Sequence, residues 1–145
     1  MLIIKSPATR QEFKEYYALR FKVLREPWGH PQGTEKDDYE PISKHFMAVD
    51  DQTGKIVGVV KVYEKAPGVA HFSHLAVKPE LQRKGIGKML VARVEEVCRA
   101  EGFEVIGCNA RLETTHYFEK LGYHISALPV PYFSTVQVVW MEKKL

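Results

Sequence analysis

Two stretches of the chain carry apolar residues at the spacing of an amphipathic helix. In residues 9–25 the apolar positions are interspersed with charges, and the pattern ends before Pro27. After Gly85 they recur at i, i+3, i+4, i+8 and i+11, with most charges on the other side, until Gly102 interrupts them. Both stretches therefore predict helices. The apolar positions of the second are Ile86, Met89, Leu90, Val94 and Val97.

Most of the remaining apolar runs are short and predict strands. Residues 112–121 predict a short helix that ends at Gly122, and residues 50–54 predict a hairpin turn. Residues 28–42 have no clear period, and we expect a loop or one short helix that forms part of a substrate wall. This order of elements predicts an α/β (α+β) fold, with a mixed central sheet and helices on both faces. The predicted strands are residues 2–4, 45–49, 55–63, 68–77, 103–108, 123–128 and 135–141.

Length and composition narrow the classes of function. A chain of 145 residues is the size of one domain, so we expect a single domain over residues 1–145. The formal charge of +3 is too small to suggest nucleic-acid binding, and no apolar run has membrane-spanning length. The two cysteines, Cys98 and Cys108, follow no signal-peptide pattern. We therefore expect a cytoplasmic protein without a disulfide, a metal, a nucleic-acid partner or a membrane partner.

The segment from Gln82 to Gly87 has the composition of a phosphate-binding turn. It follows an apolar strand pattern and opens the second predicted helix. Glycines let the backbone approach a ligand closely, and a helix N-terminus offers amides and a partial positive charge. Gln82, Arg83 and Lys84 add side-chain donors beside the glycines. The segment therefore predicts a pyrophosphate site, although a glycine pair alone also fits a turn that binds nothing.

Two common glycine motifs do not fit this segment. A dinucleotide fingerprint needs a third glycine three residues after Gly87, but that residue is Leu90. A P-loop needs Ser or Thr after its Gly-Lys pair, but Met89 follows Lys88. The sequence therefore disfavours both nicotinamide dinucleotide binding and nucleotide hydrolysis.

The longer string HLAVKPELQRKGIGKMLV, residues 74–91, resembles the acetyl-CoA-binding motif of the GNAT superfamily of N-acyltransferases. That motif is Gln/Arg-x-x-Gly-x-Gly/Ala, and Gln82, Gly85 and Gly87 match it. Residues 118–123, FEKLGY, are similar to the second family signature, Tyr-Glu-Lys-Leu-Gly-Phe. The resemblance covers about residues 55–125. It implies a GNAT fold with a central mixed, largely antiparallel twisted sheet and helices on both faces.

The resemblance also implies a cosubstrate, acetyl-CoA, and no metal. The backbone of Leu75, Ala76 and Val77 is expected to pair with the pantetheine arm like an added strand. The amides of residues 83–88 are expected to bind the pyrophosphate. Arg111, where the family often has asparagine, is a further candidate contact. The implied cofactor-binding residues are Leu75, Ala76, Val77, Gln82, Arg83, Lys84, Gly85, Ile86, Gly87, Lys88, Arg111 and Phe118.

Candidate bases lie on the predicted strand before the turn, where the family often has a glutamate. This chain has no Asp or Glu in residues 69–77; His71 and Ser73 stand where two branches of the family carry it. Alternation along a strand places both on one face, whereas His71 and His74 point to opposite faces and make a poor metal pair. A histidine can accept the ammonium proton directly or through water near neutral pH, so His71 is a candidate base, although a structural or solvent-exposed histidine is the alternative.

The candidate acid departs from the family pattern. Many members place a tyrosine at the position of Phe118, but this chain has the pair in reverse order, Tyr117-Phe118. Phe118 donates no proton. Tyr117 lies about 100° away around the helix and is expected in the core, although it remains a catalytic candidate. Cys108 and Tyr123 are weaker ones.

The resulting functional hypothesis is an acyltransferase that moves an acetyl group from acetyl-CoA to a primary amine of a small molecule or peptide. The alternative is a catalytically weak acyl-CoA-binding or regulatory module. A partner-binding domain that uses exposed loop aromatics is a third interpretation. Asp37, Asp38 and Glu40 would suit a cationic acceptor, but charged loops are usually only solvated. Family habit makes a homodimer plausible.

Overall fold

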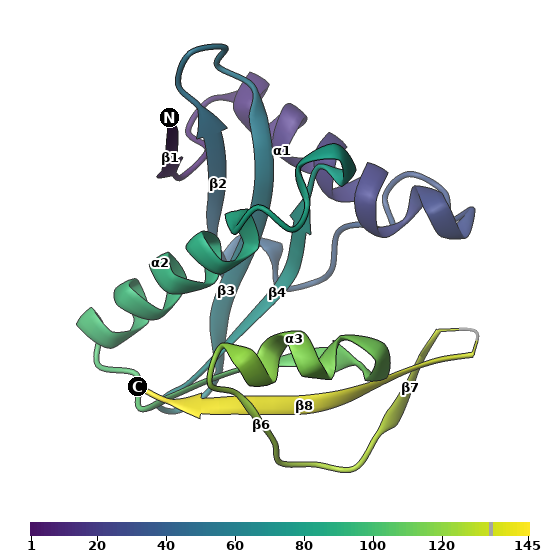
Figure 1. Ribbon diagram of the computed structural model, residues 1–145, viewed down its shortest axis with the longest axis vertical. Coiled ribbons are helices and arrows are strands. Elements are labelled where there is room, and N and C mark those ends of the chain that lie inside the picture. The colour runs from purple at the N-terminus through teal and green to yellow at the C-terminus, as the bar shows by residue number, and fades with distance from the viewer. Residues whose placement is uncertain (134) are drawn as a thin grey trace. The chain divides into compact units, whose positions relative to one another are not determined.

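The computed structural model describes residues 1–133 and 135–145 (Figure 1). Helices and strands follow one another largely as the hydrophobic pattern predicts. Short 3₁₀ turns separate them at Glu26–Trp28, Glu40–Ile42, Pro79–Leu81 and Leu112–Thr114. The helices and strands are β1 (Leu2–Lys5), α1 (Arg10–Leu24), β2 (Lys44–Asp50), β3 (Ile56–Ala66), β4 (Val69–Val77), α2 (Ile86–Ala100), β5 (Val105–Arg111), α3 (Thr115–Lys120), β6 (His124–Ile125), β7 (Val130–Phe133) and β8 (Val136–Lys144).

The strands pair in the order β1-β2-β3-β4-β5-β8-β6, and β7 also pairs with β8. Strands β4 and β5 run parallel. The pairs β1–β2, β2–β3, β5–β8, β6–β8 and β7–β8 are antiparallel. The predicted mixed, largely antiparallel sheet is thus confirmed.

The prediction was wrong in detail between α3 and β8. The predicted strand over residues 123–128 is reduced to His124–Ile125, and an additional strand lies at Val130–Phe133. Most of this additional strand is exposed, and it contains Pro131, so its residues do not show the alternation of a half-buried strand. Pro131 lacks an amide hydrogen and is tolerated on a strand at the edge of a sheet.

The chain forms two compact units. The first comprises residues 1–63 and 74–94, and the second comprises residues 64–73 and 95–145. Strands β3 and β4 and helix α2 each contribute residues to both units. The expectation of one domain over residues 1–145 stays a prediction.

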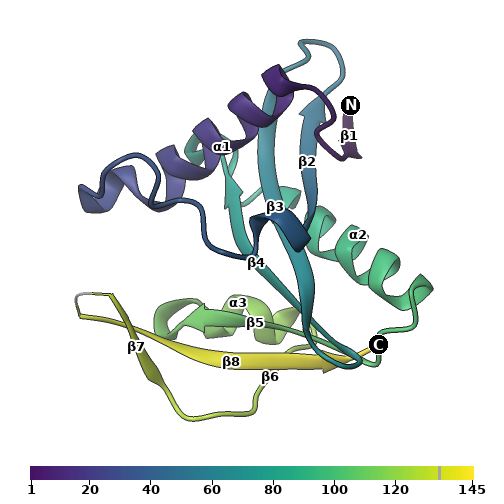
Figure 2. The ribbon, with the colours of Figure 1, turned by 180° about the vertical axis from the view of Figure 1, so that it is seen from behind.

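In the first unit, α1 and the beginning of α2 cover opposite faces of strands β2 and β3 (Figures 1 and 2). Helix α1 begins with a capping box, in which the Glu12 amide donates to the Thr9 hydroxyl at 3.0 Å and the Thr9 amide donates to the Glu12 carboxylate at 3.1 Å. A Cβ at Gly58 would lie 2.9 Å from Leu90 Cδ1, so α2 packs closely on β3. The buried residues on the α1 side are Tyr16, Leu19, Met47, Val49, Ile56, Val59 and Ala76.

In the second unit, the ring of Phe118 on α3 packs against two other aromatic rings. The ring of Phe118 lies 5.9 Å from Phe72 and 6.3 Å from Tyr123, centroid to centroid. The buried Tyr123 hydroxyl donates to Glu95 at 2.6 Å, and Lys143 Nζ donates to the same carboxylate at 3.1 Å. These contacts fix the end of α2, the α3–β6 turn and β8 within this unit.

Candidate functional site

The turn before α2 has the backbone of an anion cradle. Arg83 and Gly85 both adopt left-handed conformations, with φ of 65° and 87°. The carbonyl of Gly85 accepts from the Met89 amide at 3.0 Å, so the helix begins directly after this glycine. A Cβ built at Gly85 would have no heavy atom within 4 Å among the described residues. The turn is therefore open on the side where a ligand can approach the backbone.

The charge around this turn favours an anion. The first amides of an α-helix lack intrahelical acceptors and carry partial positive charge. Helix α2 has no acidic residue in its first turn. Arg83, Lys84 and Lys88 are exposed beside it. Because the first turn of α2 carries no acidic residue, these amides and side chains present positive charge to a ligand.

Two of the predicted contact residues have structural roles in the cradle. Gln82 Nε2 donates to the carbonyl of Val77 at 3.1 Å, which ties the turn to the end of β4. Ile86 is buried, and its Cγ2 lies 3.1 Å from the Cβ position of Gly58. The side chains of Gln82 and Ile86 thus fix the turn, whereas their backbones remain part of it.

Strand β4 reaches the cradle through an irregular segment. Ala76 is buried in the core, and Leu75 and Val77 are half-buried. His74 adopts a left-handed φ of 56°, which is rare for a residue with a side chain. The sequence argument that His71 and His74 face opposite ways assumed a regular strand, and this residue interrupts that regularity. No group of three or more metal-ligating side chains occurs within residues 1–133 and 135–145.

The other predicted site residues lie in the second unit. His71 is buried, and its ring meets the edge of Trp140 at 5.1 Å. Ser73 is half-buried. Arg111 Nε lies 3.7 Å from Glu113 Oε1 in an exposed ion pair. The structure thus divides the predicted residues, with Leu75–Val77 and Gln82–Lys88 in the first unit.

Of the two neighbours Tyr117 and Phe118, it is Phe118 that packs inward and Tyr117 that is exposed. Tyr117 is 42% exposed, so the expectation that it packs in the core was wrong. Phe118 is the ring that faces inward, against Phe72 and Tyr123. The pattern misled because α3 is only six residues long and shows less than two turns of periodicity. Desolvation nevertheless raises the pKa of Tyr117.

The two weaker acid candidates are poorly suited to proton transfer. Burial raises the pKa of the Cys108 thiol to about 12. Burial also raises the pKa of Tyr123, and its hydrogen bond to Glu95 raises it further. Cys98 and Cys108 are both buried free thiols.

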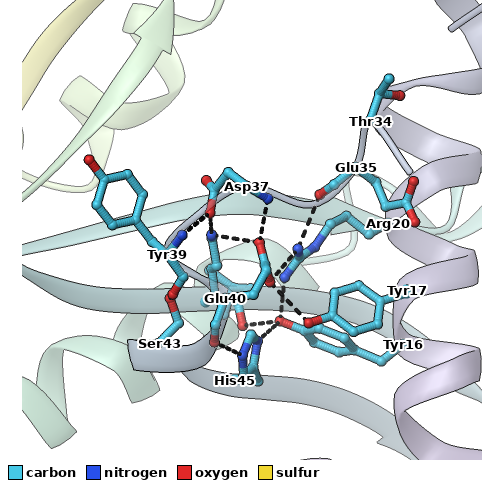
Figure 3. A network of polar contacts seen from close by, with 12 residues as sticks. Tyr16, Tyr17, Arg20, Thr34, Glu35, Asp37, Tyr39, Glu40, Ser43 and His45 are labelled. Atoms are coloured by element: carbon cyan, nitrogen blue, oxygen red, sulfur yellow. Dashed lines mark hydrogen bonds and ion pairs between the residues drawn. The ribbon is translucent and has the colours of Figure 1, made fainter. Parts of the chain in front are cut away.

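A buried charge network in the first unit has the Glu40 carboxylate at its centre (Figure 3). One oxygen accepts from Arg20 Nη1 at 2.8 Å and from the Tyr17 hydroxyl at 3.1 Å. The other accepts from Lys61 Nζ at 2.7 Å and from the Asp37 amide at 3.1 Å. Lys61 also pairs with Asp37 Oδ1. These bonds hold residues 35–42 to α1 and β3.

The network continues from Arg20 to His45. Arg20 Nη2 donates to the Tyr16 hydroxyl at 2.8 Å. That hydroxyl lies 2.8 Å from His45 Nδ1 and 3.1 Å from the carbonyl of Val60. His45 Nε2 lies 3.1 Å from the carbonyl of Glu40. Burial lowers the pKa of His45, so its ring is neutral near pH 7.

The surroundings of the network keep Glu40 ionised and His74 neutral. Burial alone would raise the pKa of Glu40, but hydrogen bonds from Lys61 and Arg20 outweigh that effect and lower the pKa to about 2. Burial also lowers the pKa of His74 to about 3, and the nearby positive charges of Arg20, Lys61 and Arg25 act in the same direction. His74 therefore lies within the electrostatic reach of the network and stays neutral.

Sequence reasoning missed this network. It treated Asp37 and Glu40 as loop charges suited to a cationic acceptor, yet both are engaged with buried cations. One signal was present in the sequence, because Lys61 interrupts an apolar strand pattern over residues 56–63. A wholly buried lysine requires a carboxylate partner, and the acidic residues 37–40 provide it.

Known proteins share both the sequence pattern and the fold. The sequence model of the acetyltransferase (GNAT) family matches residues 8–123. A protein from Lactobacillus plantarum assigned as an N-acetyltransferase has a TM-score of 0.86 at 23% identity, with 99% of this chain and 98% of that chain covered. An aminoglycoside 6′-N-acetyltransferase complexed with coenzyme A has a TM-score of 0.81 at 18% identity, with 98% and 96% covered.

A third solved structure is an acetyltransferase from Bacillus subtilis in complex with CoA. Its TM-score is 0.78 at 20% identity, and the match covers 100% of this chain and 99% of that chain. Such identities establish a shared fold. None of the helices that the structure describes has the length and apolar character needed to cross a membrane.

Proposed function

The chain belongs to the acetyltransferase (GNAT) family, and from this premise we propose that it transfers the acetyl group of acetyl-CoA to a primary amine. The amine belongs to a small molecule or to an exposed amino group of a peptide. The observation that carries the proposal is the cradle, in which Arg83 and Gly85 are left-handed and α2 begins without an acidic residue. The buried free thiols Cys98 and Cys108 support a cytoplasmic protein.

The residues of the cradle fit coenzyme A. The pyrophosphate would bind the backbone amides of residues 83–88, with the ammonium groups of Lys84 and Lys88 beside it. Gly85 leaves room for that approach, because a Cβ there would have no described neighbour within 4 Å. The pantetheine arm would pair with the backbone of residues 75–77.

Acetyl transfer requires an amine, a positioned thioester and two proton movements. The neutral amine attacks the thioester carbonyl carbon, the carbon–sulfur bond breaks, and coenzyme A leaves as a thiolate that takes up a proton. We assign His71 or Ser73 to the loss of the amine proton and the exposed Tyr117 hydroxyl to the protonation of the thiolate. Arg111 and Phe118 are assigned to cofactor contact. Positioning supplies most of the rate in such a reaction.

A second candidate function is a catalytically weak acyl-CoA-binding module. Phe118 has no hydroxyl group, and the pKa values of Cys108 and Tyr123 are raised by burial. These observations favour a protein that binds acetyl-CoA but transfers its acetyl group slowly. Phe118→Tyr distinguishes the candidates, because it supplies a hydroxyl at the family position. If the wild type lacks an acid, this variant should raise kcat by about two orders of magnitude. If Tyr117 already serves, Tyr117→Phe should lower kcat instead.

Calorimetry with coenzyme A and an amine-dependent assay of thiol release from acetyl-CoA test the proposal together. We expect saturable coenzyme A binding and thiol release that depends on an added amine. Binding without thiol release for any amine would favour the second candidate. A folded protein that does not bind coenzyme A would contradict both.

A further inference from the structure

The amine acceptor must reach the thioester, which lies at the end of the pantetheine arm that is farthest from the cradle. This step rests on the proposed function. If the pyrophosphate lies at residues 83–88 and the pantetheine arm runs back along residues 77 to 75, the thioester lies beyond Leu75, towards His74. Lys61 lies on β3 and His74 on β4, which are neighbouring strands of the sheet, and the Lys78 amide of the segment after β4 donates to the carbonyl of Val57 on β3 at 2.9 Å. The strand that carries Lys61 and the segment beside which the thioester end would lie are thus neighbours in the first unit.

The charges within this network balance one another. Arg20 and Lys61 are wholly buried, and their two positive charges are matched by Glu40 and Asp37. Asp37 Oδ1 also accepts from the Tyr39 amide at 2.9 Å. A polycation would therefore have to displace Lys61 to use these carboxylates fully. Asp37 and Glu40 are therefore poor sites for a polyamine, and of the three carboxylates that the sequence suggested for a cation only the exposed Asp38 lies outside these ion pairs.

The segment that the network holds, residues 35–42, exposes an aromatic ring that is held in place. The rings of Tyr39 and Tyr63 stack with centroids 4.3 Å apart and planes 6° from parallel. Tyr39 is nevertheless 46% exposed, whereas Tyr63 is buried, so the uncovered part of the pair belongs to Tyr39. In Figure 3 the Tyr39 ring points away from the centre of the network.

The backbone of Tyr39 is fixed on both sides. Its amide donates to Asp37, and its carbonyl accepts from Ser43 Oγ at 2.6 Å and from the Ile42 amide at 3.2 Å. A ring that is already ordered loses little conformational freedom when a ligand stacks on it. A fixed aromatic surface is therefore suited to an aromatic ligand that stacks on it.

We propose that Tyr39, supported by Tyr63, is the acceptor subsite and that the acceptor is an arylalkylamine. The aryl ring stacks on the open face of Tyr39, and the amino group extends towards the thioester. Glu40 and Lys61 act as positioning residues, since they hold the segment that carries Tyr39 and do not contact the acceptor.

Three amines and acetyl-CoA test this assignment through thiol release. They are 2-phenylethylamine, hexylamine of similar length without a ring, and spermidine as the polycation. We expect kcat/KM for 2-phenylethylamine to exceed the other two. Stacking contributes modestly, so Tyr39→Ala should raise KM for 2-phenylethylamine about fivefold to tenfold, with kcat and coenzyme A affinity nearly unchanged. Tyr39→Phe should behave like the wild type.

Tyr132→Ala is the matched control, because Tyr132 is another half-exposed tyrosine, on β7. It should leave KM unchanged. Equal kcat/KM for hexylamine and 2-phenylethylamine, a preference for spermidine, or an effect of Tyr132→Ala in place of Tyr39→Ala would each overturn the subsite while leaving acetyl transfer intact.

A binding measurement covers the case of slow chemistry. Saturation-transfer NMR on the protein with coenzyme A should show contact with the 2-phenylethylamine ring that disappears in Tyr39→Ala. If coenzyme A binds and no such contact is seen, the subsite is wrong. If coenzyme A does not bind, the proposed function itself fails.

Discussion

The cradle and the Glu40 network use charge in opposite ways. In the cradle, Arg83, Lys84 and Lys88 are exposed beside helix amides that have no intrahelical acceptor. In the network, Arg20 and Lys61 are wholly buried and paired with carboxylates. Positive charge that is exposed is available to a ligand, whereas positive charge that is paired and buried stabilises a local structure. The role of a charged residue therefore depends on its burial and its partners, and the residue type alone does not reveal it.

The largest expected effect comes from breaking the network at its centre. Glu40→Leu leaves Arg20 without its carboxylate and Lys61 with Asp37 alone. Removing one member of a buried ion pair costs about 3 to 5 kcal/mol of unfolding free energy. Urea unfolding at pH 7 measures this loss. Asp38→Asn, an exposed neighbour, should change stability by less than about 0.5 kcal/mol. A loss below about 1 kcal/mol for Glu40→Leu would mean that the network is not stabilised as its geometry suggests.

The next effect separates backbone conformation from ligand binding at the cradle. Gly85→Leu places a side chain where the pyrophosphate is expected, and coenzyme A affinity should fall on the order of tenfold or more by calorimetry. Gly102→Leu is the matched control. Gly102 has nearly the same φ, 89°, and an equally open Cβ position, but it follows the C-terminus of α2.

Both glycine variants should lose about 1 to 2 kcal/mol of stability from left-handed strain. Only Gly85→Leu should lose affinity for coenzyme A. An equal loss of affinity in both variants would show that strain, and not access to the backbone, controls binding.

Acid should weaken the network specifically. The folded-state pKa of Glu40 is about 2, below its ordinary value of 4.5. Its stabilisation is therefore fully present above pH 4.5 and is lost as the pH falls from 4.5 towards 2. After allowance for solvent screening, the advantage of the wild type over Glu40→Gln should shrink by about 1 to 2 kcal/mol between pH 5 and pH 3. An advantage that stays constant over this range would contradict the low pKa.

Salt provides the smallest test. Lys84→Met should weaken coenzyme A binding about twofold to fivefold in 50 mM NaCl, and the difference should vanish at about 0.5 M because exposed charges are screened. Lys55→Met, an exposed lysine in the β2–β3 turn, is the control and should have no effect on affinity. The stability loss of Glu40→Leu should persist at high salt, because buried pairs are screened much less. A salt-independent effect of Lys84→Met would place that side chain among buried contacts.

The sequence predicted the elements whose pattern repeats over several turns or whose motif is local. Helix α2 and the turn before it were found because the apolar spacing from Ile86 and the glycines at 85 and 87 are contiguous in the chain. The orientation of Tyr117 was not found, because α3 is too short for its period to decide which face is buried. The left-handed conformation of His74 could not be predicted, because the residue is not a glycine and its neighbours have the pattern of a regular strand.

The network was beyond sequence reasoning for a different reason. Its members come from α1, the segment before β2, and β3, so their proximity depends on tertiary packing. Asp37 and Glu40 look the same in sequence whether they face solvent or a buried lysine. The folded structure pairs these two carboxylates with buried cations and leaves the Tyr39 ring beside them half-exposed.

The hydrogen bonds of His45 determine where its proton lies. The carbonyl of Glu40 can only accept, so Nε2 carries the hydrogen, and Nδ1 of the neutral ring accepts from the Tyr16 hydroxyl. If His45 gains a second proton, Nδ1 becomes a donor to Tyr16, and the hydroxyl can rotate towards the carbonyl of Val60 at 3.1 Å. The hydrogens on the His45 ring and on the Tyr16 hydroxyl keep an acceptor in both arrangements. Rotation of the Tyr16 hydroxyl thus lets His45 accept one proton while each of these hydrogens keeps a hydrogen-bond acceptor.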